Sequence, residues 1–372
     1  MKYFYLLLPA LLAQAGLSCQ GQTNDFTPSD SLFPKVDRKA REAVTETGFP
    51  GIAIGIVAGG ETVYAEGFGF ADLEKKIPAD AETVYQLGSV TKTVTGHLLA
   101  RLVVEGQLSL DDPVDKYLPE RVSLKDAADR PVTVLQVATH SAELPRYPAN
   151  LQRVDPDPIR GFSKEELYAG LGMVEIDTLA GHRYAYSNFG YGFLGTLMEN
   201  TSGKSLNRLM HRYLFDSLEM DHSSLILTEK AAERLAVPYL EVDPLTSTEP
   251  WDMGALSGAG NLFSSVADLT KLMRHLLRSS PANRLQQQPY LKINDHWSYG
   301  LGCFLIDSES KNTEIVYHGG DIDGYASYLA LYPEFDFGIV ILTNYGEGRL
   351  FGPVAEEIAS AAFEVLSGGE ED

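Results

Sequence analysis

Strand-like segments gather at the two ends of this chain, and this distribution constrains the fold more than any other feature. Near the start, residues 51–58 (GIAIGIVA) form an uninterrupted apolar run, as expected for a strand buried on both faces. Residues 61–70 return after a glycine turn, which predicts a hairpin. Near the end, β-branched or aromatic runs separated by turns predict strands at residues 299–306, 314–318, 325–331 and 338–343.

The long middle of the chain has a different character. From about residue 110 to 250 it is helical and rich in loops, with many Pro and Asp breaks. This order of elements predicts an α+β fold, in which an antiparallel β-sheet flanked by helices is built from both chain ends around an inserted, mostly helical region. Flanking helices are expected at about residues 32–47, 91–106 and 351–366.

These patterns also predict the domain boundaries. We expect one domain over residues 35–366, with an α/β part at 35–109 and 255–366 and a helical insertion at 110–254. A polar linker at 19–34 precedes it, and an acidic tail at 367–372 follows it.

The first 18 residues are expected to be a signal peptide, because Lys2 precedes an apolar run at residues 3–13. Two processing sites compete: a small-x-small site that ends at Ala15, and a lipoprotein-like box that ends at Cys19. The second site would give the mature protein a lipid anchor at Cys19. Both predict export, either to the periplasm or to a membrane-anchored position.

Charge and cysteine content exclude several classes of partner. The chain has 30 Lys and Arg against 51 Asp and Glu, a net charge of −21 that repels nucleic acid and anionic lipid. The second cysteine, Cys303, lies in an apolar run and is expected to be a buried small hydrophobe. No CxxC or HExxH spacing occurs, so we expect neither a metal ion nor another cofactor. The sequence leaves the oligomeric state open.

The first chemical motif is Ser89-Val90-Thr91-Lys92, which opens a predicted helix after Gly88. Residues three apart share one helix face, so the Lys92 amine is expected beside the Ser89 hydroxyl. A serine needs a base to become a nucleophile, and a buried lysine with a lowered pKa can supply one. Taken alone, the motif fits a helix N-cap with a solvated lysine better than a catalytic pair.

A second motif is Tyr186-Ser187-Asn188, within an aromatic-rich segment that could simply pack into a core. A tyrosine near ammonium groups can have a depressed pKa and serve as general base and then acid. The amide of Asn188 can hydrogen-bond a substrate amide and the lysine at once.

The third motif is His318-Gly319-Gly320, which we expect to end the strand that precedes it. Glycines on a strand let a ligand backbone approach closely, and a strand edge beside Ser89 could bind an extended substrate. His318 would add either a titratable cation or a neutral donor. The alternative is a simple glycine turn.

In this order, the three motifs resemble those of the class C β-lactamase and penicillin-binding-protein family, in an HxG variant. Residues 85–88 (YQLG), 132–144 and 258–272 are similar to family stretches too, and the resemblance covers about residues 35–366. It implies that Ser89 is the acyl-accepting nucleophile, with Lys92 and Tyr186 as the base system. It further implies that Asn188 orients the substrate and that the backbone N–H groups of Ser89 and Asp321 form an oxyanion hole.

His318 is the main departure, since β-lactamases usually have a lysine there that helps to hold the β-lactam carboxylate. With Gly320, it is expected to line the substrate-binding strand. The resemblance therefore implies a hydrolase of D-amino-acid peptides, cell-wall peptides or small esters. The alternatives are a β-lactamase proper, a transacylase or esterase that shares every site residue, and a catalytically silent cell-wall binding protein. His140, beside Ser141, is expected to make structural hydrogen bonds and not to act as a base.

Overall fold

The computed structural model describes residues 33–152, 157–240, 245–308, 310–346 and 348–367. The predicted signal peptide, both processing sites with Cys19, nearly all of the linker and residues 368–372 of the acidic tail lie outside this range.

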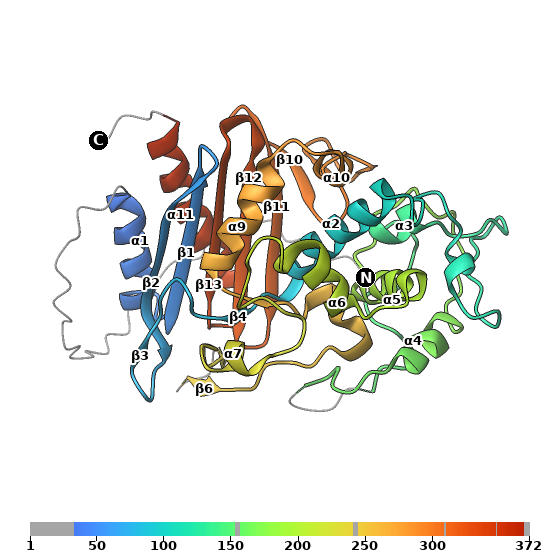
Figure 1. The fold of residues 1–372 in the computed structure, drawn as a ribbon, viewed down its shortest axis with the longest axis horizontal. Coiled ribbons are helices and arrows are strands. Elements are labelled where there is room, and N and C mark those ends of the chain that lie inside the picture. The colour runs from blue at the N-terminus through green and yellow to red at the C-terminus, as the bar shows by residue number, and fades with distance from the viewer. Residues whose placement is uncertain (1–32, 153–156, 241–244, 309, 347, 368–372) are drawn as a thin grey trace, which may run out of the picture.

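A nine-stranded antiparallel sheet forms the centre of the molecule, in the order β3-β2-β1-β13-β12-β11-β10-β9-β8 (Figure 1). β1 pairs with β13 from Ile52 opposite Thr343 to Ala58 opposite Phe337, so both chain ends meet in the middle of the sheet. This arrangement confirms the predicted fold class. The strands are β1 (Gly51–Ala58), β2 (Glu61–Asp72), β3 (Ile77–Pro78), β8 (Leu291–Lys292), β9 (Trp297–Tyr299), β10 (Phe304–Ser308), β11 (Thr313–Ile322), β12 (Tyr325–Tyr332) and β13 (Phe337–Thr343).

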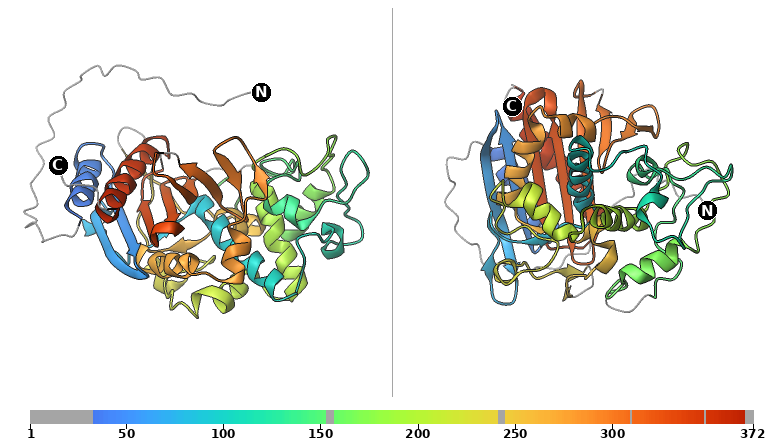
Figure 2. Two further views of the ribbon diagram at one scale, coloured as in Figure 1. Left: turned by 90° about the horizontal axis from the view of Figure 1, so that it is seen from above. Right: turned by 45° about the vertical axis from the view of Figure 1, so that its right-hand side comes forward.

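Helices cover both faces of this sheet (Figure 2). Ile54 and Ile56 of β1 pack into a core with α1 (Pro34–Thr45) and α11 (Gly348–Leu366). The alternate residue Ala53 faces a second core with α9 (Val266–Leu277), because successive strand side chains point to opposite faces. This double burial explains why the β1 sequence is apolar throughout.

The helical region lies beyond the β10 side of the sheet (Figure 1). It packs against α2 (Thr91–Val104), which is buried from Thr91 to Ala100. The remaining helices are α3 (Val134–Ala138), α4 (Lys164–Leu171), α5 (Asn188–Ser202), α6 (Leu206–Met210), α7 (Glu229–Ala232), α8 (Ser257–Gly260) and α10 (Pro281–Gln286), with short helical turns η1 (Gly88–Val90), η2 (Val114–Tyr117), η3 (His211–Phe215), η4 (Gly254–Leu256) and η5 (Pro333–Phe335). Two small strand pairs complete the fold: β4 (Tyr85–Gln86) with β7 (Phe263–Ser264), and β5 (Tyr239–Leu240) with β6 (Thr246–Ser247).

One predicted strand was wrong. Residues 299–306 do not form a single strand but the hairpin of β9 and β10, in which Phe304 pairs with Tyr299. The backbone of Gly302 at the turn has φ +76°, and a Cβ there would lie 2.0 Å from the Lys92 carbonyl oxygen. The turn therefore needs glycine to reverse direction and to press against α2.

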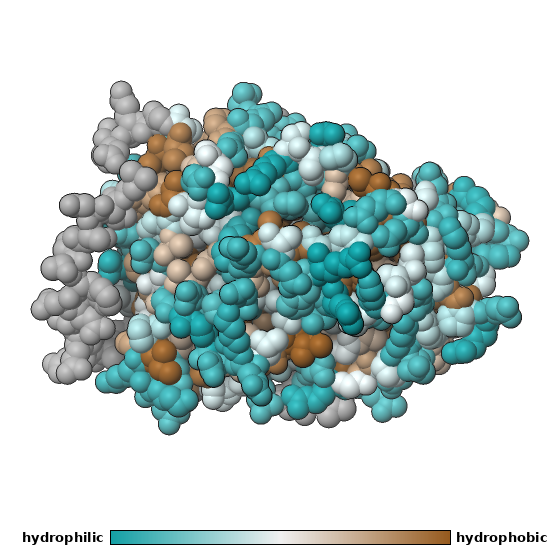
Figure 3. Space-filling model, in the orientation of Figure 1, coloured by the Kyte–Doolittle hydropathy of each residue, from teal (hydrophilic) through white to brown (hydrophobic). Residues whose placement is uncertain are grey.

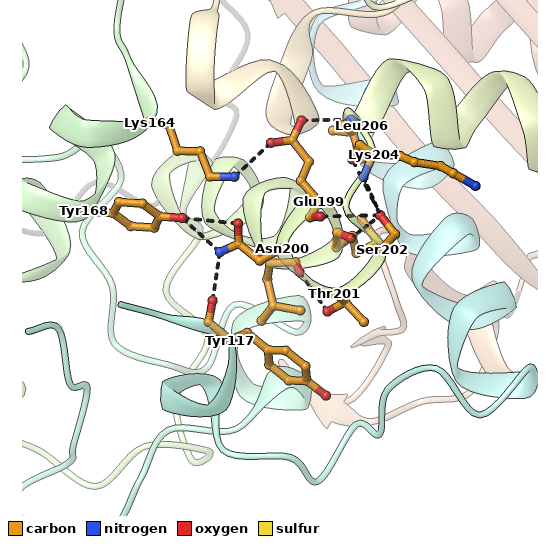
Figure 4. Close-up of polar contacts among 11 residues, drawn as sticks. Tyr117, Lys164, Tyr168, Glu199, Asn200, Thr201, Ser202, Lys204 and Leu206 are labelled. Atoms are coloured by element: carbon orange, nitrogen blue, oxygen red, sulfur yellow. Dashed lines mark hydrogen bonds and ion pairs between the residues drawn. The ribbon is translucent and has the colours of Figure 1, made fainter. Parts of the chain in front are cut away.

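The far end of α5 is held by polar contacts that its sequence supplies (Figure 4). Glu199 accepts a hydrogen bond from the Leu206 N–H at 2.8 Å and pairs with Lys164 at 3.3 Å. Asn200 donates to the carbonyl of Tyr117 at 2.8 Å. These contacts fix the axis of a helix whose first residue, Asn188, belongs to the predicted site.

The face seen in Figure 1 is largely hydrophilic, with apolar residues in scattered small groups (Figure 3). No helix among the described residues has both the length and the apolar character needed to cross a membrane.

Candidate active site

Ser89 lies in η1, directly before α2, and its side chain is partly exposed. Gly88 adopts φ +51°, which turns the chain from the short strand β4 into η1. Lys92 follows in the first turn of α2 and is completely buried. Its amine lies 3.0 Å from the Ser89 hydroxyl oxygen, on the same helix face as the spacing predicts.

Tyr186 reaches the same hydroxyl from a distant part of the sequence. It lies two residues before α5, and its phenol donates a hydrogen bond to the Ser89 oxygen at 2.7 Å. Its ring centroid lies 4.8 Å from the Lys92 amine and 4.5 Å from the ring of His140. Ser89 is thus contacted by a lysine and a tyrosine at once.

The surroundings favour the uncharged form of both groups. Burial lowers the pKa of Lys92 well below its usual value, and the nearby charge of Arg146 lowers it further. Burial also raises the pKa of Tyr186, although the hydrogen bond to Ser89 and the Arg146 charge act in the opposite direction. The expectation of a depressed tyrosine pKa was therefore wrong, because loss of hydration outweighs the neighbouring cations.

The strand that carries the third motif does not end where predicted. β11 continues through His318 to Ile322, and its pairing with β12 runs from Val316 opposite Leu331 to Ile322 opposite Tyr325. Its pairing with β10 stops one residue before His318. From residue 318 to residue 322, the edge of β11 that faces β10 therefore has no pairing with β10. Glycine does not interrupt this strand, because the β12 partner strand continues alongside it.

His318 is buried, and burial together with the Lys92 charge lowers its pKa to about 3. Its Nδ1 atom lies 2.7 Å from the carbonyl oxygen of Gly319, a separation at which Nδ1–H donates. Of the two predicted states, titratable cation or neutral donor, these surroundings favour the neutral donor.

Gly320 brings β11 against the serine. A Cβ at this position would lie 2.1 Å from the Leu87 carbonyl oxygen and 3.0 Å from the Ser89 nitrogen, so no larger residue fits without a shift. A Cβ on Gly88 would in turn lie 3.0 Å from the Asp321 nitrogen. The backbone nitrogens of Ser89 and Asp321 therefore belong to two segments in close contact.

Asn188 is the first residue of α5 and is 6% exposed. Its backbone N–H donates to the carbonyl of Arg146 at 3.0 Å, while its side-chain oxygen is buried without a hydrogen-bond partner among the described residues. The expected bond to Lys92 is not present, since the second contact of that amine is the Ala259 carbonyl oxygen at 2.6 Å.

Two residues of this site were missed in the sequence. Ala259 lies within the stretch 258–272 that resembles the family, but a backbone acceptor has no side-chain signature. Arg146 is exposed, and its guanidinium carbon lies 5.2 Å from the Tyr186 ring centroid. Its position shortly after the 132–144 stretch was the one signal that could have pointed to it.

His140 has a structural role, as expected. Its Nδ1 atom accepts a hydrogen bond from the Ser187 N–H at 3.0 Å, and burial lowers its pKa well below the usual value. This bond helps to fix the segment that carries Tyr186. Cys303 is fully buried, and burial raises the pKa of its thiol. Within the described ranges, no group of three or more His, Cys, Asp or Glu side chains could hold a metal ion.

Two curated proteins are similar to this chain over most of its length. The chain is 23% identical over 382 residues to the D-alanyl-D-alanine-carboxypeptidase/endopeptidase AmpH of Escherichia coli (strain K12), covering 98% of this chain and 97% of AmpH. It is 24% identical over 322 residues to Protein flp of Staphylococcus aureus (strain N315), a match that spans 83% of this chain but only 62% of flp.

Two solved structures share the fold. The octameric penicillin-binding protein homologue from Pyrococcus abyssi superposes with a TM-score of 0.76 at 28% identity, covering 90% of this chain and 77% of that one. The β-lactamase/D-alanine carboxypeptidase from Yersinia pestis gives 0.79 at 21% identity, covering 90% and 98%. The family model described as Beta-lactamase matches residues 36–363, and the chain therefore belongs to this family of serine hydrolases.

Proposed function

We propose that this chain is an exported hydrolase that cleaves an amide or ester bond through an acyl-enzyme on Ser89. Its proposed substrates are D-amino-acid peptides, cell-wall peptides or small esters. One observation carries the proposal: the Ser89 hydroxyl lies 3.0 Å from the Lys92 amine and 2.7 Å from the Tyr186 phenol, in surroundings that favour a neutral amine.

In the proposed acylation step, the neutral Lys92 amine accepts the hydroxyl proton while the Ser89 oxygen attacks the substrate carbonyl carbon. As the bond to the leaving nitrogen or oxygen breaks, Tyr186 gives that atom its phenolic proton. The lysine ammonium then returns a proton to the tyrosine, so that both groups regain their starting state. Water or another acceptor releases the acyl group by the reverse sequence.

The backbone N–H groups of Ser89 and Asp321 are the proposed oxyanion hole. The close contact of η1 with β11 at Gly88 and Gly320 supports this assignment. One such donor contributes about 3–4 kcal/mol of transition-state stabilisation. The edge of β11 that β10 leaves unpaired, from His318 to Ile322, is the proposed binding strand for an extended substrate. The buried oxygen of Asn188, which has no partner among the described residues, supports its proposed contact with an N–H on the acyl half of the substrate.

Two further assignments belong to this proposal. We assign residues 35–366 to one hydrolase domain, an extent that the family match over 36–363 supports, and we place the helical insertion at 110–254 within it. Export rests on Lys2 and the apolar run that follows it, and either processing site is compatible with it.

Two relatives support a D-alanyl peptide as the substrate class, namely the D-alanyl-D-alanine-carboxypeptidase/endopeptidase AmpH and the β-lactamase/D-alanine carboxypeptidase from Yersinia pestis. β-Lactam hydrolysis is the second candidate, favoured by the family match. Against it, burial disfavours the protonated form of His318, so this position lacks a permanent cation for a β-lactam carboxylate.

The test is an initial-rate panel on the purified wild type and Ser89→Ala. It compares a short-chain p-nitrophenyl ester, a chromogenic cephalosporin and a D-alanyl peptide, with mass spectrometry of the intact protein to detect an acyl adduct. We expect Ser89-dependent turnover, fastest on the peptide or the ester. Absence of both turnover and adduct would favour the silent binding protein. Turnover that is fastest on the cephalosporin would favour the β-lactamase.

A further inference from the structure

Arg146 is an exposed cation beside the proposed nucleophile. Its guanidinium carbon lies 5.2 Å from the centroid of the Tyr186 ring, whose phenol contacts Ser89. Its charge also acts on the pKa values of Lys92 and Tyr186, which places it within electrostatic reach of both.

No carboxylate neutralises this arginine within the part of the chain that the structure describes. Two arginines elsewhere do have such a partner, since the exposed Arg183 pairs with Glu143 and the half-buried Arg234 pairs with Asp80. The whole chain carries a net charge of −21. A cation beside a nucleophile that has no carboxylate partner among the described residues is therefore well suited to bind a negatively charged ligand.

Asn188, next to the backbone of Arg146, supplies a second, independent sign of a ligand. Its side chain is more than nine-tenths buried, and its oxygen has no hydrogen-bond partner among the described residues. The backbone N–H groups of Asn188 and Phe189 both donate to the carbonyl of Arg146, at 3.0 and 3.2 Å. The start of α5 thereby fixes the backbone from which the arginine extends.

His318 does not offer an alternative cation. It is buried, its pKa is lowered to about 3, and its Nδ1 atom is engaged with the Gly319 carbonyl oxygen. The position at which a β-lactamase usually carries a lysine is therefore neutral at ordinary pH. Lys92 is buried against Ser89 and Ala259, so among the described residues that surround Ser89 the accessible positive group is Arg146.

We propose that Arg146 is a substrate-binding residue that holds a carboxylate on the acyl half of the substrate, the half that remains attached to Ser89. The inference rests on the proposed function, in which Asn188 contacts the acyl half, because the backbone N–H of Asn188 donates to the carbonyl of Arg146 and holds the two residues next to each other. A guanidinium can hold a carboxylate through two parallel hydrogen bonds, and a lysine does so less well.

The test uses two esters with the same p-nitrophenol leaving group and the same acyl chain length: the glutarate monoester, which carries a carboxylate, and the neutral pentanoate ester. Rates are corrected for spontaneous hydrolysis, which the carboxylate itself accelerates. The ratio of kcat/KM for the acidic and the neutral ester is the readout. A change in the Lys92 pKa affects both esters, so it cancels in this ratio.

We expect the wild type to prefer the acidic ester, and Arg146→Gln to lower the ratio by about tenfold, as loss of a charge-assisted contact implies. Arg146→Lys should keep part of the preference, and added salt should weaken it. Arg212→Gln is the matched control, because Arg212 is also exposed, lies 5.6 Å from a tyrosine ring and belongs to η3, which contributes no site residue. An unchanged ratio in Arg146→Gln would overturn the inference.

A binding measurement separates this inference from the proposed function. Calorimetry compares the affinity of the glutarate ester for Ser89→Ala and for Ser89→Ala combined with Arg146→Gln. Binding weakened about tenfold by the second change supports the inference even where the wild type shows no turnover. Equal binding overturns it, even where Ser89-dependent turnover supports the proposed function.

Discussion

Replacement of Tyr186 by phenylalanine tests the proposed proton transfer most directly. The change removes one oxygen, whose hydrogen bond goes to Ser89 at 2.7 Å. The phenylalanine ring can keep the contacts with His140 and with the Lys92 amine. The loss of one hydrogen bond costs about 1 kcal/mol of folding free energy, so the variant is expected to fold with nearly unchanged stability.

The effect on rate should be much larger. Positioned general acid–base groups contribute about 10²–10⁴-fold, which corresponds to about 2.7–5.5 kcal/mol of activation free energy. If Tyr186 protonates the leaving group, the loss should also depend on that group. An amide nitrogen must be protonated to leave, whereas p-nitrophenolate leaves readily without a proton. The fall in kcat/KM should therefore be at least about tenfold greater for a D-alanyl amide than for a p-nitrophenyl ester.

The assay combines initial rates on both substrates with thermal unfolding of each variant. Tyr184→Phe is the matched control, because the hydroxyl of this neighbouring tyrosine is buried and has no hydrogen-bond partner among the described residues. This change should leave both rates within about twofold of the wild-type rates, since removal of a polar group without a hydrogen bond costs little folding free energy. Equal losses on ester and amide for Tyr186→Phe, or rates like those of Tyr184→Phe, would refute the role of Tyr186 as general acid.

Three other predictions follow from the same geometry. Gly320→Ala places a Cβ 2.1 Å from the Leu87 carbonyl oxygen, so it should lower stability by about 1–3 kcal/mol and strongly reduce turnover, as thermal unfolding and initial rates will show. Lys92→Met should abolish turnover. It should also change how stability depends on pH. In the wild type, Lys92 carries a proton in the unfolded state but not in the folded state, where its pKa is lowered. The free energy of unfolding of the wild type, relative to that of the variant, should therefore rise with pH up to about pH 10.4. Equal slopes of Tm against pH would contradict the lowered pKa. His318 has a pKa of about 3, so wild type and His318→Gln should show pH–rate profiles of the same shape between about pH 5 and 8; a limb near pH 6.5 that only the wild type shows would contradict a neutral histidine.

Local sequence patterns were sufficient to predict much of the sheet. The apolar run of β1 matches its observed bounds, Gly51–Ala58, because a strand covered on both faces needs apolar residues throughout. The break between β9 and β10 was missed, since residues 299–306 contain no turn signal stronger than their glycines. At Gly302 the turn packs closely against the Lys92 carbonyl of α2. This contact, which requires glycine, arises only in the folded state.

Three features could be predicted from the sequence alone: the antiparallel sheet built from both chain ends, the Ser89–Lys92 spacing on one helix face, and the order of the three motifs. These features depend on periodicity and short spacing, which are local properties of the chain. Folding in three dimensions was needed to bring Tyr186 against Ser89, to raise the pKa of Tyr186 instead of depressing it, and to place Arg146 beside the site with no carboxylate partner among the described residues. Burial and charge proximity depend on segments far apart in the sequence, and burial is the largest cause of the pKa shifts of Lys92, Tyr186 and His318.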